Sequence, residues 1–437
     1  MRRALPALAG LAAFALILTA CGNGSSDGDT NNTDASPSSD ASSVDPASLT
    51  ADLTWWDTSD PTNEGPAFEK LIAKFNETYP NITINYQSVP FGDAQNKFKT
   101  AAASGTGAPD ILRAEVAWVP EFASLGYLFA LDGTPLLDGN FLETPLSSNV
   151  YDGQTYGVPQ VTDTLGLMYN KKLFAKAGID TPPTTWAEVA ADAKLLKKKA
   201  KVDGIYINSG GYFLLPFIYG EGGDIVNTDE QKILINSAED VAGLSTAQGL
   251  VKSGAAVKPD ANDSYGTMMT LFKEGKVAMI INGPWEVANI SGDPKFGGFE
   301  NLGIAPVPAG SAGAGAPVGG HNYVIWSGMD EAKSDAAIAF VEFMSSPESE
   351  AFVANELGLL PGNADAYDQL TDNEKVAAWK PALDVAKPRP WIPEGGLFFA
   401  PLDTMATQIM IQGVAPQKAA DEAAKTFKSD VVPDYSD

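Results

Sequence analysis

Aromatic side chains lie close to carboxylates at several points of this chain, and sugars are recognised by that combination. Sugar rings present apolar C–H faces that pack on aromatic rings, and their hydroxyls hydrogen-bond to carboxylates and amides. The aromatic candidates are Trp56, Trp118, Tyr212, Trp285 and Phe399. The acidic candidates are Asp57, Asp60, Glu64, Glu115, Asp163 and Asp403.

Taken singly, most of these residues have an ordinary structural explanation. An isolated aromatic residue is more often part of a core, and an isolated acid is more often a helix cap or a surface group. Trp285 is the exception, because Gly283 and Pro284 end a buried strand immediately before it and expose the indole.

Other chemistries lack the residues that they need. The chain has one histidine, His321, and one cysteine, Cys21, which excludes a His/Cys metal cage and a Cys–His nucleophile pair. No Gly-x-Ser-x-Gly elbow between a strand and a helix accompanies His321, and the glycine-rich segment 309–320 lacks the spacing of a phosphate-binding loop. A pair of carboxylates stays open as a catalytic device, although abundant acids make any such pair a weak signal.

Charge narrows the choice of partner. The 437 residues carry a net charge of −26, and removal of Arg2 and Arg3 with a leader would leave 27 basic against 55 acidic residues. Such a surface repels polyanions, so we expect no nucleic acid partner. It also disfavours small anions, and a neutral ligand fits best.

The N-terminal residues predict a targeting segment rather than a part of the fold. A basic start, an apolar run to Ala20 and small residues before Cys21 predict a signal peptide over residues 1–20. The sequence around Cys21 resembles the bacterial lipobox, which implies a lipid on this thiol and tethering to the outer face of the cytoplasmic membrane. Residues 21–48 are polar and small and predict a flexible tether. With a single cysteine, no disulfide can form within the chain.

The next hundred residues predict alternating strands and helices. Strands are expected over 52–56, 82–86 and 110–112, separated by a helix that ends at Pro80 and by another over 93–104. Phe68, Leu71 and Phe75 form one apolar stripe on the first of these helices. This order is typical of a parallel α/β unit.

Residues 156–171 predict a strand that crosses from this unit into a second one, with Asp163 facing the gap between them. In the second unit, Thr185 and Glu188 form a capping box that opens a helix, and the lysines over 194–201 are expected as a solvated face at its end. Residues 309–320 are expected as a loop before a strand over 323–326. The C-terminal part is expected to be helical over 371–385, 398–412 and 416–427.

Several segments together resemble the extracellular solute-binding proteins of bacterial ABC transporters, specifically the maltose/maltodextrin-binding group. The matching segments are 75–82, 108–111, 156–159, 167–171, 272–279 and 282–285. Residues 388–390 and 400–404 are similar to those of actinobacterial members. The resemblance covers essentially the whole chain after the leader.

The resemblance implies a two-lobe periplasmic-binding-protein-like α/β fold of class II, in which each lobe has a mainly parallel sheet flanked by helices. Lobe 1 would comprise residues 49–160 and about 316–362, and lobe 2 would comprise 161–315 and about 363–437, with a helical C-terminal part.

The resemblance also implies roles for single residues. Asp163 would take the acidic position beside the hinge strand, and Tyr212 and Trp285 would be aromatic platforms of lobe 2. The loop from Thr58 to Glu64, which includes Ser59, would contact hydroxyls from lobe 1. Phe399 would be the late aromatic platform, and Asp403 would replace the arginine beside it. The early acidic–basic pair of the family falls near Trp118, and that contact would be missing or replaced by Glu115. His321 would lie at the cleft rim or be simply a loop residue.

The implied function is the capture of an oligosaccharide, maltose, maltodextrin or a related α-glucoside, for delivery to a membrane permease, by a monomer without cofactor, metal or catalysis. A cell-surface glycan-cleaving enzyme that uses paired carboxylates is the alternative. A structural or adhesive lipoprotein is a third class.

Overall fold

A computed structural model describes residues 46–436, so the predicted signal peptide, the predicted lipid site Cys21 and most of the predicted tether lie outside the described residues. The last residues of that tether are part of the fold. Pro46–Ser48 form a 3-10 turn, and the side-chain amide of Asn81 donates to the Ala47 carbonyl oxygen at 2.8 Å. Among residues 46–436, no helix is both long and apolar enough to cross a membrane.

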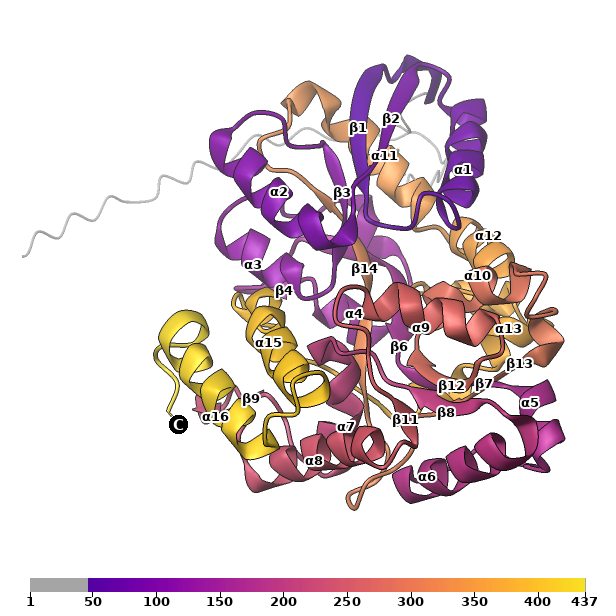
Figure 1. The fold of residues 1–437 in the computed structure, drawn as a ribbon. Coiled ribbons are helices and arrows are strands. Elements are labelled where there is room, and N and C mark those ends of the chain that lie inside the picture. Colours follow the sequence, from indigo (N-terminus) through magenta and orange to yellow (C-terminus); the bar gives the residue numbers. More distant parts are fainter. Residues whose placement is uncertain (1–45, 437) are drawn as a thin grey trace, which may run out of the picture. The chain divides into compact units, whose positions relative to one another are not determined.

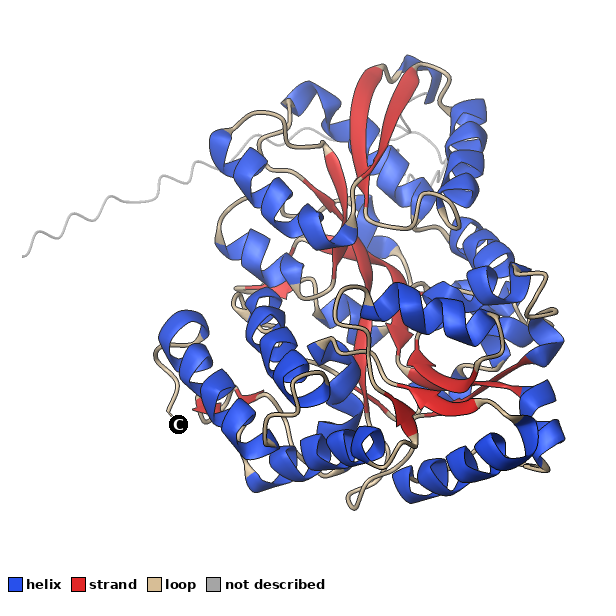
Figure 2. Cartoon of the chain, viewed as in Figure 1, coloured by secondary structure: helices blue, strands red, loops and turns tan. Residues whose placement is uncertain are grey.

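Two sheets organise the described chain (Figures 1 and 2). The strands of the first sheet are, in spatial order, β15 (Leu360–Pro361), β6 (Gly157–Thr164), β14 (Ala316–Ile325), β3 (Ile111–Glu115), β1 (Ala51–Asp57) and β2 (Ile82–Ser88), with β16 (Ala386–Lys387) paired to β14. The strands of the second are β11 (Ala256–Val257), β8 (Asp203–Tyr206), β12 (Val277–Asn282), β7 (Gly166–Asn170) and β13 (Leu302–Pro306). The predicted α/β fold class is thus confirmed.

Both sheets are mixed, which corrects the expectation of mainly parallel sheets. The pairs β1–β2, β1–β3, β8–β11 and β8–β12 are parallel, whereas β14 pairs antiparallel with β3 and β6, and β7 pairs antiparallel with β12 and β13. Every antiparallel pair of these two sheets includes β6, β7 or β14. Of these, β6 continues into β7 through Leu165 alone, so the chain passes from the first sheet to the second within one residue.

Helices cover both sheets. Those that pack with the first sheet and its edges are α1 (Gly65–Thr78), α2 (Phe91–Ser104), α3 (Trp118–Ser124), α4 (Glu143–Ser147), α11 (Ser334–Met344) and α12 (Pro347–Leu357). Those that pack with the second sheet or with its helices are α5 (Lys171–Ala177), α6 (Trp186–Leu195), α7 (Leu215–Gly220), α8 (Ala238–Lys252), α9 (Ser264–Lys273), α10 (Val287–Gly292), α13 (Glu374–Ala377), α14 (Lys380–Leu383), α15 (Phe399–Met410) and α16 (Pro416–Thr426). Short hairpins, β4 (Val150–Tyr151) with β5 (Gln154–Thr155) and β9 (Val226–Asn227) with β10 (Lys232–Ile233), lie outside the sheets.

Local signals explain several of these helices. The stripe Phe68, Leu71 and Phe75 is buried on α1, as predicted. The capping box at α6 forms, since the Thr185 side chain accepts from the Glu188 amide and the Glu188 carboxylate accepts from the Thr185 amide. The predicted helix over 371–385 is instead two short helices, because α14 starts at Lys380 with Pro381 in its first turn, where a missing N–H costs nothing.

The predicted loop over 309–320 ends earlier than expected, since β14 already begins at Ala316. Gly319 and Gly320 belong to this strand, and close approach of the neighbouring strand explains both glycines. A Cβ at Gly319 would lie 2.2 Å from Asp163 Oδ1, and a Cβ at Gly320 would lie 2.2 Å from the Val161 carbonyl oxygen. Gly320 also has a φ of +135°, which side chains other than glycine rarely adopt.

Candidate functional site

Asp163 is an almost buried carboxylate without a hydrogen-bond partner among the described residues. It lies near the end of β6, directly opposite Gly319 of β14, and is 8% exposed. Burial, and then the charge of the Glu115 carboxylate, raise its pKa to about 7, against the lowering effects of Arg389 and Arg113. A carboxylate held in this way is poised to accept hydrogen bonds from a ligand that replaces the missing partners.

Tyr212 meets Asp163 at Gly319. A Cβ on Gly319 would lie 2.8 Å from the Tyr212 hydroxyl as well as 2.2 Å from Asp163 Oδ1. Tyr212 is carried by the 3-10 turn Gly211–Leu214, and its hydroxyl lies 3.5 Å from the Pro317 carbonyl oxygen. Burial, and then the charge of Asp163, raise the pKa of Tyr212 well above its usual range, so the phenol is a neutral donor and acceptor.

Arg389 and Glu115 form a buried ion pair next to these two residues. Nη2 of Arg389 contacts Oε1 of Glu115, and Nε donates to the Val318 carbonyl oxygen at 2.9 Å. The guanidinium carbon of Arg389 lies over three aromatic rings, 5.7 Å from Tyr212, 5.6 Å from Trp391 and 5.3 Å from Phe399. We call these three rings the aromatic cage. Sequence reasoning missed both Arg389 and Trp391 as site residues.

Asp403, predicted as a ligand contact, already has a hydrogen-bond partner within the protein. Its Oδ1 accepts the backbone N–H of Gly211 at 2.7 Å, so it holds the turn that carries Tyr212. The arginine expected near Phe399, whose place in the sequence Asp403 takes, is supplied in space by Arg389. Phe399 itself lies 5.9 Å from the Tyr212 ring, as part of the aromatic cage.

The polar loop after β1 is organised around Asp57 and Arg113. Asp57 is fully buried and accepts hydrogen bonds from the Ser59 backbone and hydroxyl and, at 2.7 Å, from the Tyr86 hydroxyl. Arg113 Nε lies 3.9 Å from Asp57 Oδ1 and donates to Gln160 Oε1 at 2.8 Å. Asp57 and Ser59 are therefore largely satisfied within the loop, and Arg113, which the sequence did not suggest, neutralises the acid.

Asp60 and Glu64 shape the same loop. Asp60 is exposed and caps its own turn, accepting from the amides of Thr62 and Asn63 at 2.8 Å each. Glu64 is 6% exposed and accepts the Asp60 amide at 2.9 Å. Burial raises the pKa of Glu64 to about 7, against the lowering effect of Arg113; the charge of Glu286 contributes to the rise. Glu64 and Glu286 belong to different predicted lobes, and the charge of Glu286 raises the pKa of Glu64.

Trp285 is half-buried and packs against core clusters of both sheets. Its Nε1 donates to the Tyr265 hydroxyl at 2.7 Å, and this hydroxyl donates to Glu286 Oε1 at 2.7 Å. The indole is thus held by one hydrogen bond at its edge and packs against the cores of both sheets. That placement suits a platform that a ligand would contact.

The remaining predicted residues are Trp56, Trp118 and His321. Trp56 packs in a core cluster, with Nε1 donating to Gln87 Oε1 at 3.1 Å and Lys97 Nζ 4.4 Å from its ring centroid. Trp118 is 5% exposed, and its ring centroid lies 5.1 Å from that of Phe91. His321 has no hydrogen-bond partner for either ring nitrogen among the described residues, and burial lowers its pKa well below the usual range, so it is neutral.

The structure therefore brings Asp163, Tyr212, Phe399 and Glu115 together with Arg389, and it leaves Trp56 in a core. The combination of a free carboxylate, a phenol, a guanidinium and flat rings suits a neutral polyhydroxylated ligand. Among residues 46–436, no group of three or more His, Cys, Asp or Glu residues is arranged to hold a metal ion.

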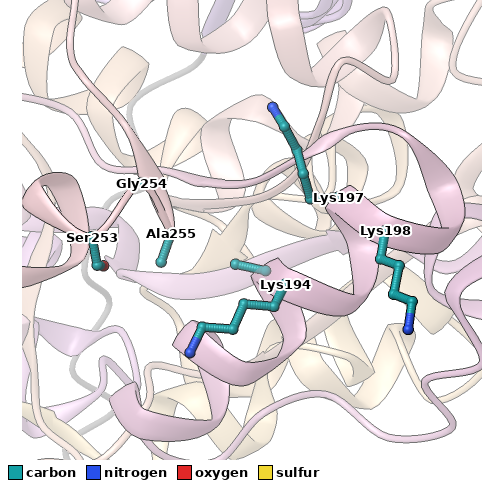
Figure 3. A pocket seen from close by; sticks show the side chains of 7 residues that line it. Lys194, Lys197, Lys198, Ser253, Gly254 and Ala255 are labelled. Atoms are coloured by element: carbon teal, nitrogen blue, oxygen red, sulfur yellow. The ribbon is translucent and has the colours of Figure 1, made fainter.

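A surface hollow of about 370 Å³ lies elsewhere, where the end of α6 meets the end of α8 (Figure 3). It is lined by Lys194, Lys197, Lys198 and the segment 253–255. The lysines are exposed at the end of the helix, as the sequence predicted, and Lys197 pairs with Asp203. None of the predicted ligand-binding residues lines this hollow.

Comparisons with known proteins agree with this geometry. Residues 58–351 match the family described as bacterial extracellular solute-binding protein. The solved GacH receptor of Streptomyces glaucescens, described unliganded and in complex with acarbose, is 40% identical with a TM-score of 0.85, over 89% of this chain and 100% of that one.

Two further similar proteins have names that describe sugar binding. The diacetylchitobiose binding protein DasA of Streptomyces coelicolor is 27% identical, and the match covers 98% of both chains. The maltose/maltodextrin-binding domain MalE from Bdellovibrio bacteriovorus, solved with maltotriose, is 25% identical with a TM-score of 0.76, over 86% of this chain and 98% of that one.

Proposed function

Since this chain belongs to the family of bacterial extracellular solute-binding proteins, we propose that it captures an oligosaccharide, of the maltose or maltodextrin type or a related α-glucoside, and delivers it to the permease of an ABC importer. The observation that carries the ligand class is the convergence of the unpartnered Asp163 carboxylate and the Tyr212 hydroxyl at Gly319, beside the aromatic cage. Sugar hydroxyls would hydrogen-bond to Asp163 and Tyr212, and the faces of the sugar rings would pack on the aromatic cage.

The two lobes would close on the ligand by hinge bending. Residues 49–160 with about 316–362 form lobe 1 in this proposal, and residues 161–315 with about 363–437 form lobe 2. Leu165, between β6 and β7, is one of the points where the backbone changes from one sheet to the other, and few-residue connections of this kind absorb hinge rotations. The permease would recognise the closed, loaded form.

Among the predicted ligand residues, we assign direct contact to Asp163, Tyr212, Trp285 and Phe399, with Glu115 and Arg389 as charged partners. Asp57, Ser59, Asp60 and Glu64 would present the loop of lobe 1, and Asp403 would position Tyr212. Trp118 and His321 would lie at one end of the ligand. Trp56 would support this surface from the core.

A thermal-shift panel of α- and β-linked oligosaccharides tests the proposal. Binding to the folded state raises the melting temperature by an amount that grows with ligand concentration. We expect α-linked glucose oligomers to give the largest rise. A flat response to every sugar would refute sugar capture and favour a structural or adhesive role.

The protein would bind its ligand without cleaving it. The relatives above are binding proteins, which supports this assignment over that of a glycan-cleaving enzyme. The test is incubation of the purified protein with the oligosaccharide that it binds, followed by an assay for new reducing ends. Formation of reducing ends that is lost in an Asp163→Asn variant would instead establish catalysis.

We also propose that the protein is a monomer anchored through a lipid on Cys21 at the outer face of the cytoplasmic membrane, so that residues 22–45 set its reach from the bilayer. A Cys21→Ser variant should appear in the medium rather than in the membrane fraction. Retention of that variant in the membrane would show that another feature anchors it.

A further inference from the structure

Phe91 is the most exposed of the large hydrophobic side chains in the described chain. It is 49% exposed, against 48% for Leu125, 43% for Val150 and 36% for Leu397. A single exposed apolar residue is common on protein surfaces. Phe91 differs from the other three because its ring is held in a fixed aromatic setting.

Two rings hold Phe91 in place at the start of α2. Its centroid lies 5.1 Å from that of Trp118 with an angle of 31° between the ring planes, and 6.0 Å from His321 with an angle of 73°. A ring that packs against two neighbours and is still 49% exposed keeps its orientation when a ligand face packs on it, as a stacking platform does.

The Phe91 platform is continuous with the candidate site. His321 lies directly opposite Glu115 in the β14–β3 pair, and Glu115 pairs with Arg389 inside the aromatic cage. The turn 395–397, just before Phe399, also reaches Trp118, because a Cβ on Gly396 would lie 3.3 Å from Trp118 Cδ1. A row of contacts therefore runs from the Tyr212 end of the site to Phe91.

From this row we infer that Phe91 is an outer platform for an additional sugar ring, so that the protein discriminates oligosaccharides by length. This inference rests on the proposed function and adds which ligands the site prefers: chains longer than a disaccharide. The inner rings of the ligand would lie at Asp163 and the aromatic cage, and the outermost would pack on the open face of Phe91.

Calorimetric titration of the purified protein with α-1,4-linked glucose oligomers, from the disaccharide to the heptasaccharide, tests this. The wild-type affinity should rise with length and then level off. Phe91→Ala should leave the disaccharide affinity unchanged and lower the affinity for the longer oligomers by about 2- to 15-fold, the range expected for one aromatic stacking contact. Phe91→Tyr, which keeps the ring, should behave like the wild type.

Leu125→Ala is the matched control, because Leu125 is 48% exposed against 49% for Phe91 and is not among the residues assigned to the site. It should leave the whole length series unchanged. A Phe91→Ala series parallel to the wild type, or an equal loss at every length, would overturn the outer platform while the proposed function stands. A wild-type protein that binds no member of the series, nor any sugar of the wider panel, would overturn the proposed function and this inference with it.

Discussion

Arg389 and Glu115 are 274 positions apart in the sequence, yet their side chains are in direct contact and 4% and 11% exposed. Glu115 ends β3 of the first sheet. Arg389 follows β16 and packs on Tyr212 and Phe399, which belong to the core of the second sheet. The pair therefore links the end of β3 to aromatic rings that pack against the core of the second sheet, at the place where we locate the ligand.

This geometry predicts non-additive losses of stability. Arg389→Met or Glu115→Gln alone should lower the free energy of unfolding by about 3–5 kcal/mol, because each leaves a buried group without its counterpart. The double variant should lose less than the sum of the two. Urea unfolding of the four proteins measures the coupling.

Lys70 and Glu356 provide the control, since they form an exposed ion pair with side chains 60% and 42% exposed. Lys70→Met should change the free energy of unfolding by less than about 1 kcal/mol. Additive losses for Arg389 and Glu115 would show that their contact contributes nothing.

Asp163 predicts a pH dependence of ligand affinity. With a pKa of about 7, roughly a tenth of this carboxyl is ionised at pH 6 and most of it at pH 8. If sugar hydroxyls donate to the carboxylate, affinity should rise up to about tenfold between these pH values and then level off. Calorimetry across this range with wild type and Asp163→Asn measures it. The variant should bind more weakly at pH 8 and lose the pH dependence, and an unchanged profile would remove Asp163 from the site.

Glu64 predicts that stability falls as the pH rises. Its pKa is about 7 in the folded protein against an ordinary value of 4.5, so the folded state holds the extra proton between these values. The free energy of unfolding should therefore decrease from pH 4.5 to pH 7 and stay low above it. Glu64→Gln should be more stable than wild type at pH 8, by at most about 3 kcal/mol, and equal to it near pH 4.

Urea unfolding at a series of pH values measures this difference. Glu69→Gln, an exposed position on the same α1 helix, is the matched control and should follow the wild-type curve. If the free energy of unfolding changed with pH in the same way for wild type and Glu64→Gln, the raised pKa of Glu64 would be contradicted.

Gly319 predicts that one methyl group can block the site. In Gly319→Ala the new Cβ would lie 2.2 Å from Asp163 Oδ1 and 2.8 Å from the Tyr212 hydroxyl, so both groups must move. Affinity should fall about tenfold or more, as overpacking of a fitted site does. Gly249→Ala, whose added Cβ would have no neighbour within 4 Å, should bind like wild type. Equal affinities for both variants would place the ligand elsewhere.

Local signals in the sequence were sufficient for much of the fold. The stripe on α1 and the capping box at Thr185 and Glu188 depend on residues within a few positions of each other, and both formed as predicted. The helix over 371–385 failed for a local reason as well, since Pro381 starts a new helix there.

The candidate site depended on distant contacts and was only partly predictable. Asp163 was identified from its place beside the crossing strand. Arg113 and Arg389 were not, because the groups that they neutralise come from other elements of the chain. Trp55 and Trp56 are both buried, since the first sheet is covered on both faces, so the assignment of Trp56 to the ligand surface stays a prediction.

The single residue between β6 and β7 has a consequence for how loading could be communicated. Asp163 precedes Leu165 by only two positions, so the group that would first sense a sugar and the backbone that would rotate are parts of one short peptide. No relay of intervening side chains is then needed to report that a ligand is bound. On ligand binding, the backbone at Leu165 would change before the more distant parts of the two lobes do.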